Sequence, residues 1–544
     1  LAFPQALAGV LSVSLLYAMV KCQFGAGAGL VAALALATMP VAVAVERNNT
    51  VDGLLSLVLL LAAWAFLRAV QYGRLRDLLS AVVLVGLGFN IKMLQAFMPL
   101  PAFYALYLFG ALPSWWKRIA YLMAATVVLV GVSLSWAIVV DLTPTNERPF
   151  IGGSKDNTVM DLIVGYNTLT RLGLSRGQTP GPPPPPGGGT LGPPPPPPGA
   201  PNPAQEVGQP GVRRLFIQPL VTEASWLLPF VLLGLLLILS QVGWRWPLSD
   251  KYLAVVLWGG WLLPEVVYFS FNRGLFHAHY LVMLGPPLSA LVGATTWALG
   301  EIHRKRHWLG WMLLALLAGS TIAFQIVTLQ RHQGYAMWVV PTSMKLLRQG
   351  QRLAALLLMD VWWLAAIAIA LLAFGLGTLA LRVRRAQAWV NKAALGIAII
   401  ATMVAPLLWS ALTTFNTKPD GCLPRSGRHI HHTNCLSALP ADQRWMLSHL
   451  LANTKPGSYL VATLTAYDAA LYILATQRPV LPLGGFTGED SVVDIGKLAQ
   501  MVQDGRVRFV LEDRDLPWRK PEIAAWLNTN CQRQNGRLYD CGGR

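Results

Sequence analysis

The sequence predicts a polytopic α-helical membrane protein with a small α/β domain exported at its C-terminal end. Three observations support this fold class. Of the 544 residues, 54% are hydrophobic and only 12% are charged. The hydrophobic residues form uninterrupted runs long enough for helices to span a bilayer core, which takes about 20 residues, and they lack the alternation of membrane β-barrel strands. The stretch 415–544 instead alternates short strand and helix patterns.

We expect about twelve membrane spans, which together make a transmembrane domain over residues 1–414. Only helices and closed barrels satisfy their backbone hydrogen bonds inside a bilayer, so each run is expected to be a helix. The expected spans are 3–20, 26–45, 51–70, 79–90, 94–111, 119–140, 225–243, 252–270, 280–298, 308–328, 354–381 and 393–413.

Lysines and arginines gather in the short connections on one side of these spans, which is typical of the cytoplasmic face. The opposite short turns hold little more than Arg47, Lys92 and Arg273, although the segment 330–352 is also basic and fits less well. With an even number of spans both termini lie outside, so we expect a multi-pass plasma-membrane protein whose 415–544 domain is extracytoplasmic. The net charge of +18 then follows largely from insertion topology and needs no nucleic-acid partner. The basic residues of the expected cytoplasmic side are Lys21, Arg68, Arg74, Arg76, Lys117, Arg118, Arg245, Lys251, Arg304, Lys305, Arg306, Arg382, Arg384, Arg385 and Lys392.

The longest interruption between spans is the outer loop 142–224. Its middle part, 179–212, is Pro/Gly-rich, cannot bury a core, and should be disordered or extended. An inserted spacer explains this run better than a ligand for a proline-recognition domain. Before it, "RPFIGGSKDNTVMDLIVGYNTLTRLG" interleaves polar and apolar residues at about helical spacing, which predicts an amphipathic helix on the membrane surface. Its polar residues include Asn157, Tyr166 and Asn167.

The exported stretch 415–544 alternates strand and helix patterns. "SYLVATL", "PVLPLGG" and "VRFVLED" are typical of strands, and "AYDAALYILAT" and "VVDIGKLAQMVQDG" are typical of helices. This alternation predicts a small α/β unit with a parallel sheet. Its loop "GGFTGED" at 484–490 follows a strand, where open α/β sheets commonly bind ligands. Acceptor docking and a purely structural cap both remain open for this loop.

Four of the five cysteines fall in the exported stretch, where thiols tend to form disulfides. We expect Cys422 to pair with Cys435 and Cys531 with Cys541, since each pair closes a short loop, although spacing alone does not fix connectivity. The histidines near Cys435 lack a second ligand group with regular zinc spacing. No metal and no cofactor is therefore expected.

Three short outer turns carry most of the distinctive polar chemistry. Ionisable residues at a membrane edge are costly unless they are paired or used. If these turns converge, they form a cationic pocket with carboxylates beside it. Such a pocket suits a phosphate on a lipid tail, because arginine makes bidentate contacts to phosphate oxygens and lysine supplies a point charge. The turns are "ERNNTVD" with Glu46, Arg47 and Asp52, a second with Lys92, and "FNRGLFHAHYL" with Arg273, His277 and Tyr280.

The same residues predict a chemistry. A carboxylate, with Asp52 and Glu46 as the candidates, can deprotonate an acceptor hydroxyl as it attacks a sugar carbon, with the lipid phosphate as leaving group. Fixed cations stabilise the departing phosphate, which gains charge in the transition state.

Each of these residues also has a simpler explanation. Asp52 can cap the helix that starts near it, and Glu46 and Arg47 can form an interfacial ion pair. Lys92 can extend from a helix end toward water, and Tyr280 fits an aromatic belt. Glu265, inside a predicted span, can pair with another helix.

The order of these motifs resembles the bacterial relatives of protein O-mannosyltransferases and of the lipid A aminoarabinose transferase, which are GT-C glycosyltransferases that use polyprenyl-phosphate sugars. The resemblance covers nearly the whole chain. It rests on an outer Arg before an Asp at the next helix start, on "GLGFNIKMLQAFMPLPAF", and on "FIGGSKDNTVMDLIVGYNTLTRL". It rests also on "FHAHYLVMLGPPLSAL", similar to the family's FHPYY segment with Ala278 and His279 replacing its middle residues. The exported domain is similar to that of a mannosyltransferase subgroup.

The resemblance implies a GT-C fold and places the principal catalytic acidic residue in a first outer loop, which we expect upstream of Leu1. It carries family roles to Arg47, Asp52 and Lys92, and more loosely to His277 and Tyr280. From the residues themselves we expect Arg47 and Lys92 near the donor phosphate, with Arg273 in the same cationic pocket, and Asp52 and Glu46 as candidate catalytic or acceptor-side carboxylates. We also expect the segment 152–171, with Asn157, Tyr166 and Asn167, to cover the substrate.

We therefore predict an enzyme that moves a hexose or modified pentose from a polyprenyl-phosphate carrier to a lipid or cell-envelope acceptor at the outer face. One competing hypothesis is a lipid or solute transporter, which would place polar groups near the midplane and use repeated broken helices. Another is a degenerate transferase core that anchors an exported binding domain. Membrane lipids are partners under each hypothesis.

Overall fold

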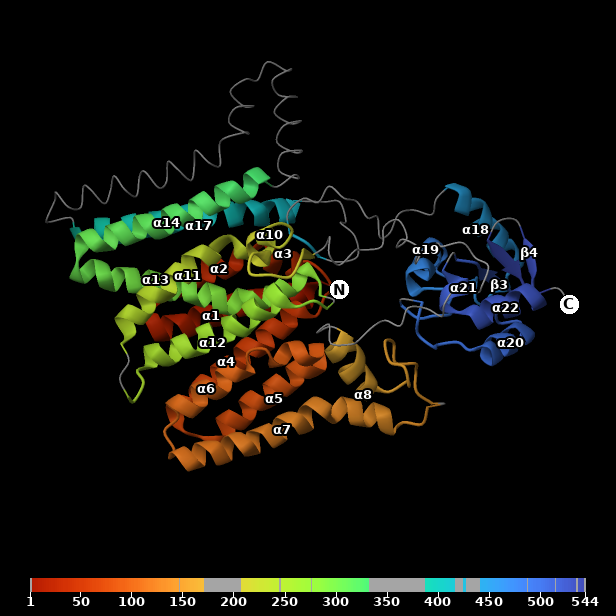
Figure 1. Ribbon diagram of the computed structural model, residues 1–544, viewed down its shortest axis with the longest axis horizontal. Coiled ribbons are helices and arrows are strands. Elements are labelled where there is room, and N and C mark those ends of the chain that lie inside the picture. The colour runs from red at the N-terminus through yellow and green to blue at the C-terminus, as the bar shows by residue number, and fades with distance from the viewer. Residues whose placement is uncertain are drawn as a thin grey trace, which may run out of the picture. The chain divides into compact units, whose positions relative to one another are not determined.

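The computed structural model describes residues 2–145, 147–170, 207–243, 246–274, 276–331, 387–415, 424–426, 441–486, 488–513, 515–534 and 537–542 (Figure 1). The expected span 354–381, nearly all of the Pro/Gly-rich run, and Cys422 and Cys435 lie outside these residues. The chain divides into two compact units, Leu1–Ser135 with Ala200–His432, and Trp136–Gly199 with Thr433–Arg544.

The first unit is a bundle of helices. Helix α7 begins in it and continues into the second unit. The helices up to this point are α1 (Phe3–Phe24), α2 (Ala26–Ala37), α3 (Pro40–Glu46), α4 (Asp52–Tyr72), α5 (Leu75–Lys92), η1 (Met93–Phe97), α6 (Leu100–Gly110) and α7 (Trp115–Leu142). Those that follow are η3 (Arg214–Phe216), α10 (Val221–Ala224), η4 (Ser225–Leu227), α11 (Leu228–Val242), α12 (Asp250–Phe271), η5 (Ala278–Leu284), α13 (Gly285–Lys305), α14 (His307–Arg331) and α17 (Gln387–Phe415).

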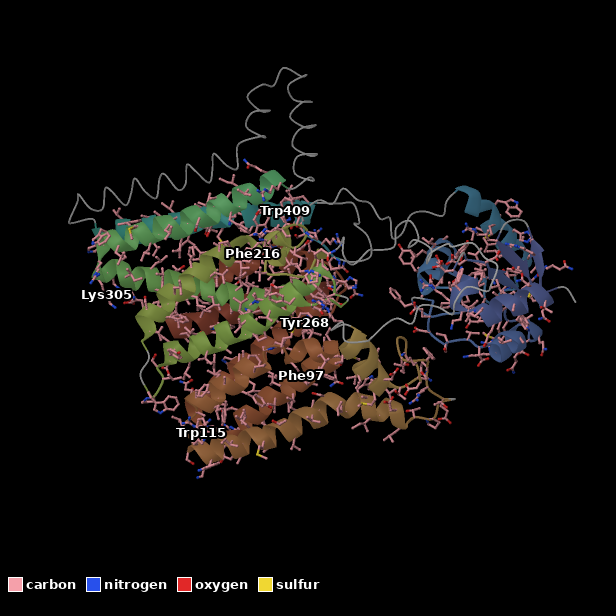
Figure 2. The ribbon with its side chains drawn as sticks, viewed as in Figure 1. Phe97, Trp115, Phe216, Tyr268, Lys305 and Trp409 are labelled. Atoms are coloured by element: carbon pink, nitrogen blue, oxygen red, sulfur yellow. A yellow bond between two sulfur atoms is a disulfide. The ribbon has the colours of Figure 1, made fainter. Side chains whose placement is uncertain are left out.

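Within the described residues, nine helical segments have the length and composition of membrane spans. They correspond to nine of the predicted runs, so the polytopic helical class is confirmed. Lys305 and Trp115 lie toward the end of the bundle where α13 ends and α7 begins (Figure 2). This end carries the basic connections of the sequence pattern.

Two predicted spans differ from the structure. The run 26–45 is a pair of helices, α2 and α3, bent by 62°. Met39 at the break is extended because the residue before a proline disfavours the helical conformation, and Pro40 starts α3. The run 94–111 is not one helix: η1 ends at Phe97 and the short helix α6 begins at Leu100. Met93 has a positive φ of 44°, and Pro99 precedes the new helix.

Helix α13 lies at the centre of the bundle, and most of its residues are buried. It packs against α1, α2, α11, α12 and α14. Gly293 allows the close approach to α2, because a Cβ there would overlap the backbone of Ala28. The turn η5 leads directly into this buried helix, so its residues are anchored by the core.

The second unit contains an α/β domain with a five-stranded sheet of order β2-β1-β3-β5-β4. The strands β1, β2 and β3 are parallel, as the sequence predicts, while β5 pairs antiparallel with β3 and β4. The strands are β1 (Ala462–Thr463), β2 (Leu481–Pro482), β3 (Phe509–Leu511), β4 (Gln532–Gln534) and β5 (Leu538–Asp540), and the helices are α18 (Ala441–Asn453), α19 (Ala466–Thr476), α20 (Ile495–Gln503), α21 (Leu516–Arg519) and α22 (Pro521–Asn530).

The outer-loop segment belongs to the same compact unit as the α/β domain, whereas the predicted boundaries were 1–414 and 415–544. Its helices are α8 (Val159–Asp161) and η2 (Leu162–Thr170). The predicted amphipathic helix is thus helical only from Val159 onward. The preceding residues form a turn, in which the Gly153 N–H donates to Asp490 Oδ1 at 3.1 Å.

Cys531 and Cys541 form a disulfide that joins the ends of the β4–β5 hairpin, as expected. We predict that replacing both cysteines with serine lowers the free energy of unfolding of the α/β domain. A bridge with a sequence separation of 10 removes unfolded-state entropy equivalent to about 2–3 kcal/mol. Urea-dependent proteolysis of the full chain measures this loss, with Cys22→Ser as the matched control because Cys22 is free and exposed. Equal protease resistance of the two variants would contradict the prediction.

Candidate active site

A buried ion pair joins the start of α4 to the end of α5. Asp52 is 1% exposed, and its Oδ1 accepts a hydrogen bond from Lys92 Nζ. Because α4 and α5 are antiparallel neighbours, the N-terminus of one meets the C-terminus of the other. An acidic residue at a helix N-terminus and a basic one at a C-terminus are both favoured by the helix dipole. Asp52 is the first residue of α4, whose N-cap is Val51, so its place in the first turn fits the helix dipole as well as the pair with Lys92.

The turn at the start of η5 completes this cluster. Lys92 Nζ lies 3.7 Å from the ring centroid of Tyr280. His279 Nε2 lies 4.0 Å from Asp52 Oδ2, and the His277 and His279 rings stack with centroids 5.5 Å apart. Three segments of the chain therefore converge on one cationic and aromatic cluster, which we call the Asp52–Lys92 cluster: Asp52, Lys92, His277, His279 and Tyr280.

A buried arginine holds the turn in place. Arg214, 4% exposed, donates to the carbonyl oxygen of Asn272 at 2.7 Å and lies 4.7 Å from the ring centroid of Phe276. Arg214 was not predicted as a site residue. His279 belongs to the predicted polar turn but was not assigned to the donor phosphate, because it replaces a residue of the family motif.

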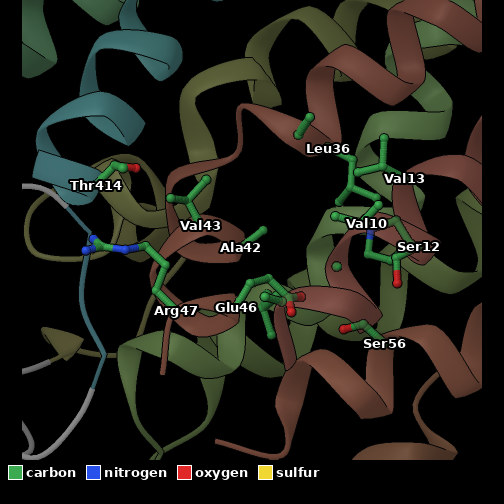
Figure 3. Close-up of a pocket in the computed structure, with 15 residues that line it drawn as sticks. Val10, Ser12, Val13, Leu36, Ala42, Val43, Glu46, Arg47, Ser56 and Thr414 are labelled. Atoms are coloured by element: carbon green, nitrogen blue, oxygen red, sulfur yellow. The ribbon is translucent and has the colours of Figure 1, made fainter. Parts of the chain in front are cut away.

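A cavity of about 350 Å³ lies between helices that include two of those that carry the cluster, although none of the five cluster residues lines it (Figure 3). It is lined by mostly apolar residues of α1, α2, α3, α4, η5, α13 and α17. Glu46 and Arg47 both line it but point in different directions, with Arg47 on the side of Thr414 (Figure 3). Glu46 is close enough to Asp52 for their charges to interact, and Val282 of η5 lines the wall. The cavity and the cluster therefore share two structural elements.

The predicted phosphate-binding residues divide into three groups. Lys92, His277 and Tyr280 lie together in the cluster. Arg47 donates to the carbonyl oxygen of Thr413, near the end of α17, and lines the cavity. Arg273 is exposed and, among the described residues, forms no ion pair with the cluster.

The predicted substrate-covering residues make local contacts. Asn157 has a positive φ of 60°, and its Oδ1 accepts a hydrogen bond from the Ile151 N–H at 2.7 Å. Asn167 Nδ2 donates to the Leu162 carbonyl oxygen at 3.2 Å. The side chain of Tyr166 lies outside the described part of the chain. These bonds shape the outer-loop segment, and the covering role stays a prediction.

Glu265 is fully buried in α12 and accepts a hydrogen bond from Trp261 Nε1 at 2.8 Å. This hydrogen bond lies within the one helix, between residues four positions apart. Among the described residues, no group of three His, Cys, Asp or Glu side chains is placed to hold a metal ion.

The loop 484–490 of the α/β domain lies at the carboxyl end of β1, where the Ala466 N–H donates to the Gly485 carbonyl oxygen at 2.7 Å. Burial raises the pKa of Asp468 on α19, and the charges of Asp513 and Asp515 raise it further. Carboxylates thus lie near this sheet edge together with basic residues, since Arg519 pairs with Glu489 and Lys520 donates to the Asp490 carbonyl oxygen. Its docking role remains a prediction.

Comparison with known proteins identifies the family. Residues 1–136 match the family described as "Dolichyl-phosphate-mannose-protein mannosyltransferase", and residues 446–530 match "Putative mannosyltransferase YkcB-like, C-terminal". The chain is 33% identical over 591 residues to "Putative mannosyltransferase YycA" of Bacillus subtilis (strain 168), covering 97% of this chain and 82% of that protein. The chain belongs to this family. "Putative mannosyltransferase YkcB" of the same organism is 32% identical over 600 residues, covering 97% of this chain and 80% of that protein.

Among solved structures, ArnT from Cupriavidus metallidurans in the apo state is 14% identical, with a TM-score of 0.43, covering 99% of this chain and 82% of that one. The same protein bound to undecaprenyl phosphate is 16% identical, with a TM-score of 0.45 and coverage of 99% and 83%. We assign no site residue from these two structures, because both TM-scores are low.

The family match confirms the predicted relationship to GT-C glycosyltransferases. This member of the YycA and YkcB family is a multi-pass membrane glycosyltransferase, and the match favours an enzyme over the transporter hypothesis.

Proposed function

We propose that the enzyme transfers a hexosyl or pentosyl group from a polyprenyl-phosphate donor to a lipid or cell-envelope acceptor at the outer face of the plasma membrane. The Asp52–Lys92 cluster, set beside a mostly apolar cavity, is the observation that carries this proposal. The basic connections at the other end of the bundle support the orientation. In that orientation the α/β domain is extracytoplasmic.

Lys92 supplies the positive charge for the donor phosphate. Its ammonium group has three donors, so it can contact phosphate oxygens while still paired with Asp52. His277, His279 and Tyr280 surround the same position and add ring N–H or hydroxyl donors. The apolar membrane-facing helices suit a lipid-linked donor, and the matched family is named for dolichyl-phosphate-mannose.

The transfer step needs a base and a stabilised leaving group. The acceptor hydroxyl oxygen attacks the anomeric carbon, its proton passes to a carboxylate, and the bond from that carbon to the phosphate oxygen breaks. Both electrons of that bond stay on the phosphate, whose growing charge Lys92 stabilises. Asp52 and Glu46 remain the candidate carboxylates among the described residues.

A transfer assay tests the proposal. Membranes that contain the chain are supplied with polyprenyl phosphate carrying a radiolabelled sugar, and the label is followed into the acceptor fraction. We expect transfer that depends on the lipid phosphate. Label that never leaves the carrier, across hexosyl and pentosyl donors, would reject the proposed function.

Arg47 provides a separate prediction. We expect Arg47→Ala to lower transfer by about tenfold without loss of expression, since the variant removes a partly exposed cation from the cavity mouth and one hydrogen bond to α17. Initial rates in membranes, normalised to protein amount, measure the effect. Wild-type turnover in this variant would remove Arg47 from the mechanism.

A further inference from the structure

One wall of the cavity carries polar atoms that the protein does not satisfy. Ser12, Glu46 and Ser56 all line this wall, and their oxygens face the same region of the cavity (Figure 3). Ser12 is 4% exposed, and neither its Oγ nor Glu46 Oε2 has a hydrogen-bond partner among the described residues. An unsatisfied buried polar group costs about 1–3 kcal/mol, and more when it is charged. A ligand that donates hydrogen bonds would satisfy both atoms.

Two glycines leave room for the Glu46 carboxylate. Gly9 of α1 and Gly53 of α4 both lie against it. A Cβ at Gly9 would come within 2.7 Å of Glu46 Cδ, and one at Gly53 within 2.8 Å of the same atom. Real Cβ atoms do not approach so closely, so both positions require glycine as long as Glu46 keeps its place. The carboxylate is therefore held by a niche built from two other helices.

The polar atoms of this wall indicate which part of a lipid-linked sugar could occupy the cavity. The phosphate is repelled by a carboxylate, and the isoprenoid chain has no hydrogen-bond donor. Sugar hydroxyls donate hydrogen bonds to carboxylate and hydroxyl oxygens, while the apolar residues that also line the cavity, including Val10, Val13 and Val282, can pack against C–H groups. A volume of about 350 Å³ is within the usual range of ligand pockets.

We propose that this cavity is the glycosyl subsite of the donor, in which Glu46 and Ser12 accept hydrogen bonds from sugar hydroxyls while the phosphate lies at Lys92. This inference rests on the proposed function. It gives Glu46 a binding role and leaves the acceptor proton to another carboxylate. Asp52 lies between the phosphate and sugar subsites, because it is paired with Lys92 and is close enough to Glu46 for their charges to interact.

Binding of two kinds of lipid to the full chain in nanodiscs tests the proposal. The probes are radiolabelled polyprenyl phosphate without sugar, and polyprenyl phosphates that carry mannose, another hexose or a pentose. We expect Glu46→Gln and Ser12→Ala to weaken binding of the preferred glycosylated lipid by about 10- to 100-fold for Glu46 and about 10-fold or less for Ser12. Binding of bare polyprenyl phosphate should not change.

Gly9→Ala provides an independent test, because its methyl group displaces the Glu46 carboxylate without changing its charge. We expect the same selective loss of glycosylated-lipid binding. Gly131→Ala is the matched control, since a Cβ at Gly131 of α7 meets nothing within 4 Å.

The outcomes separate the two proposals. If these variants weaken the binding of both kinds of lipid equally, or of neither, the cavity does not hold the sugar. The inference is then overturned, while the proposed function stands. The same conclusion follows if the wild-type protein binds no glycosylated lipid more tightly than bare polyprenyl phosphate. If the wild-type protein binds no polyprenyl phosphate at all, the proposed function fails and the inference fails with it.

Discussion

Replacing Lys92 with Ala is expected to lower kcat/KM for sugar transfer by about 10²- to 10³-fold. Removing one preorganised group that stabilises developing charge typically has an effect of this size. Lys92 is the cation at the centre of the cluster, bonded to Asp52 and stacked on Tyr280. The loss should appear mainly in kcat, since the phosphate gains charge as the bond breaks.

The substitution also leaves Asp52 buried without its partner, so activity and folding must be separated. Lys92→Arg keeps the positive charge and the ion pair but changes the shape of the cation, and we expect it to retain more activity than Lys92→Ala. Lys117→Ala is the control, because Lys117 is an exposed lysine at the start of α7. Steady-state kinetics on normally inserted protein measure all three. Wild-type kcat/KM in Lys92→Ala would show that the phosphate is stabilised elsewhere.

The sequence predicted the membrane helices well because a span depends mainly on local hydrophobicity. The bend at Pro40 and the short helix after Pro99 were not predicted, since a run of apolar residues hides where a proline redirects the backbone. In the α/β domain, the parallel strands had hydrophobic patterns that could be recognised. Strand β4 did not, because Gln532–Gln534 is polar throughout and is defined only by pairing with β5.

The sequence predicted which residues belong to the candidate site, but not which of them contact each other. The outer turns supplied Asp52, Lys92 and Tyr280, yet Asp52 and Lys92 are 40 residues apart and only the antiparallel packing of α4 and α5 joins them. Arg273 shares a turn with Tyr280 but is exposed, because the backbone of that turn is held by Arg214. Side-chain direction within a turn depends on such long-range contacts, which residue type and spacing do not encode.

Asp52→Asn is expected to lower transfer by about 10²-fold or more and to destabilise the protein as well. Asp52 is the acceptor-side candidate and also positions Lys92, so its charge affects both proton transfer and phosphate binding. The side chains of Asp52 and Lys92 are only 2% and 16% exposed. Removing one member of a buried ion pair leaves the other charge without compensation, which typically costs about 3–5 kcal/mol.

Combining Asp52→Asn with Lys92→Met separates these two effects. Neither charge is then left buried, so the double variant should regain most of the thermal stability that Asp52→Asn loses, while its transfer activity stays as low as that of the single variants. Thermal unfolding in detergent and the transfer assay, carried out on the same preparations, measure both quantities. If activity returned together with stability, the pair would serve only to join α4 to α5, and the chemistry would have to lie outside the Asp52–Lys92 cluster.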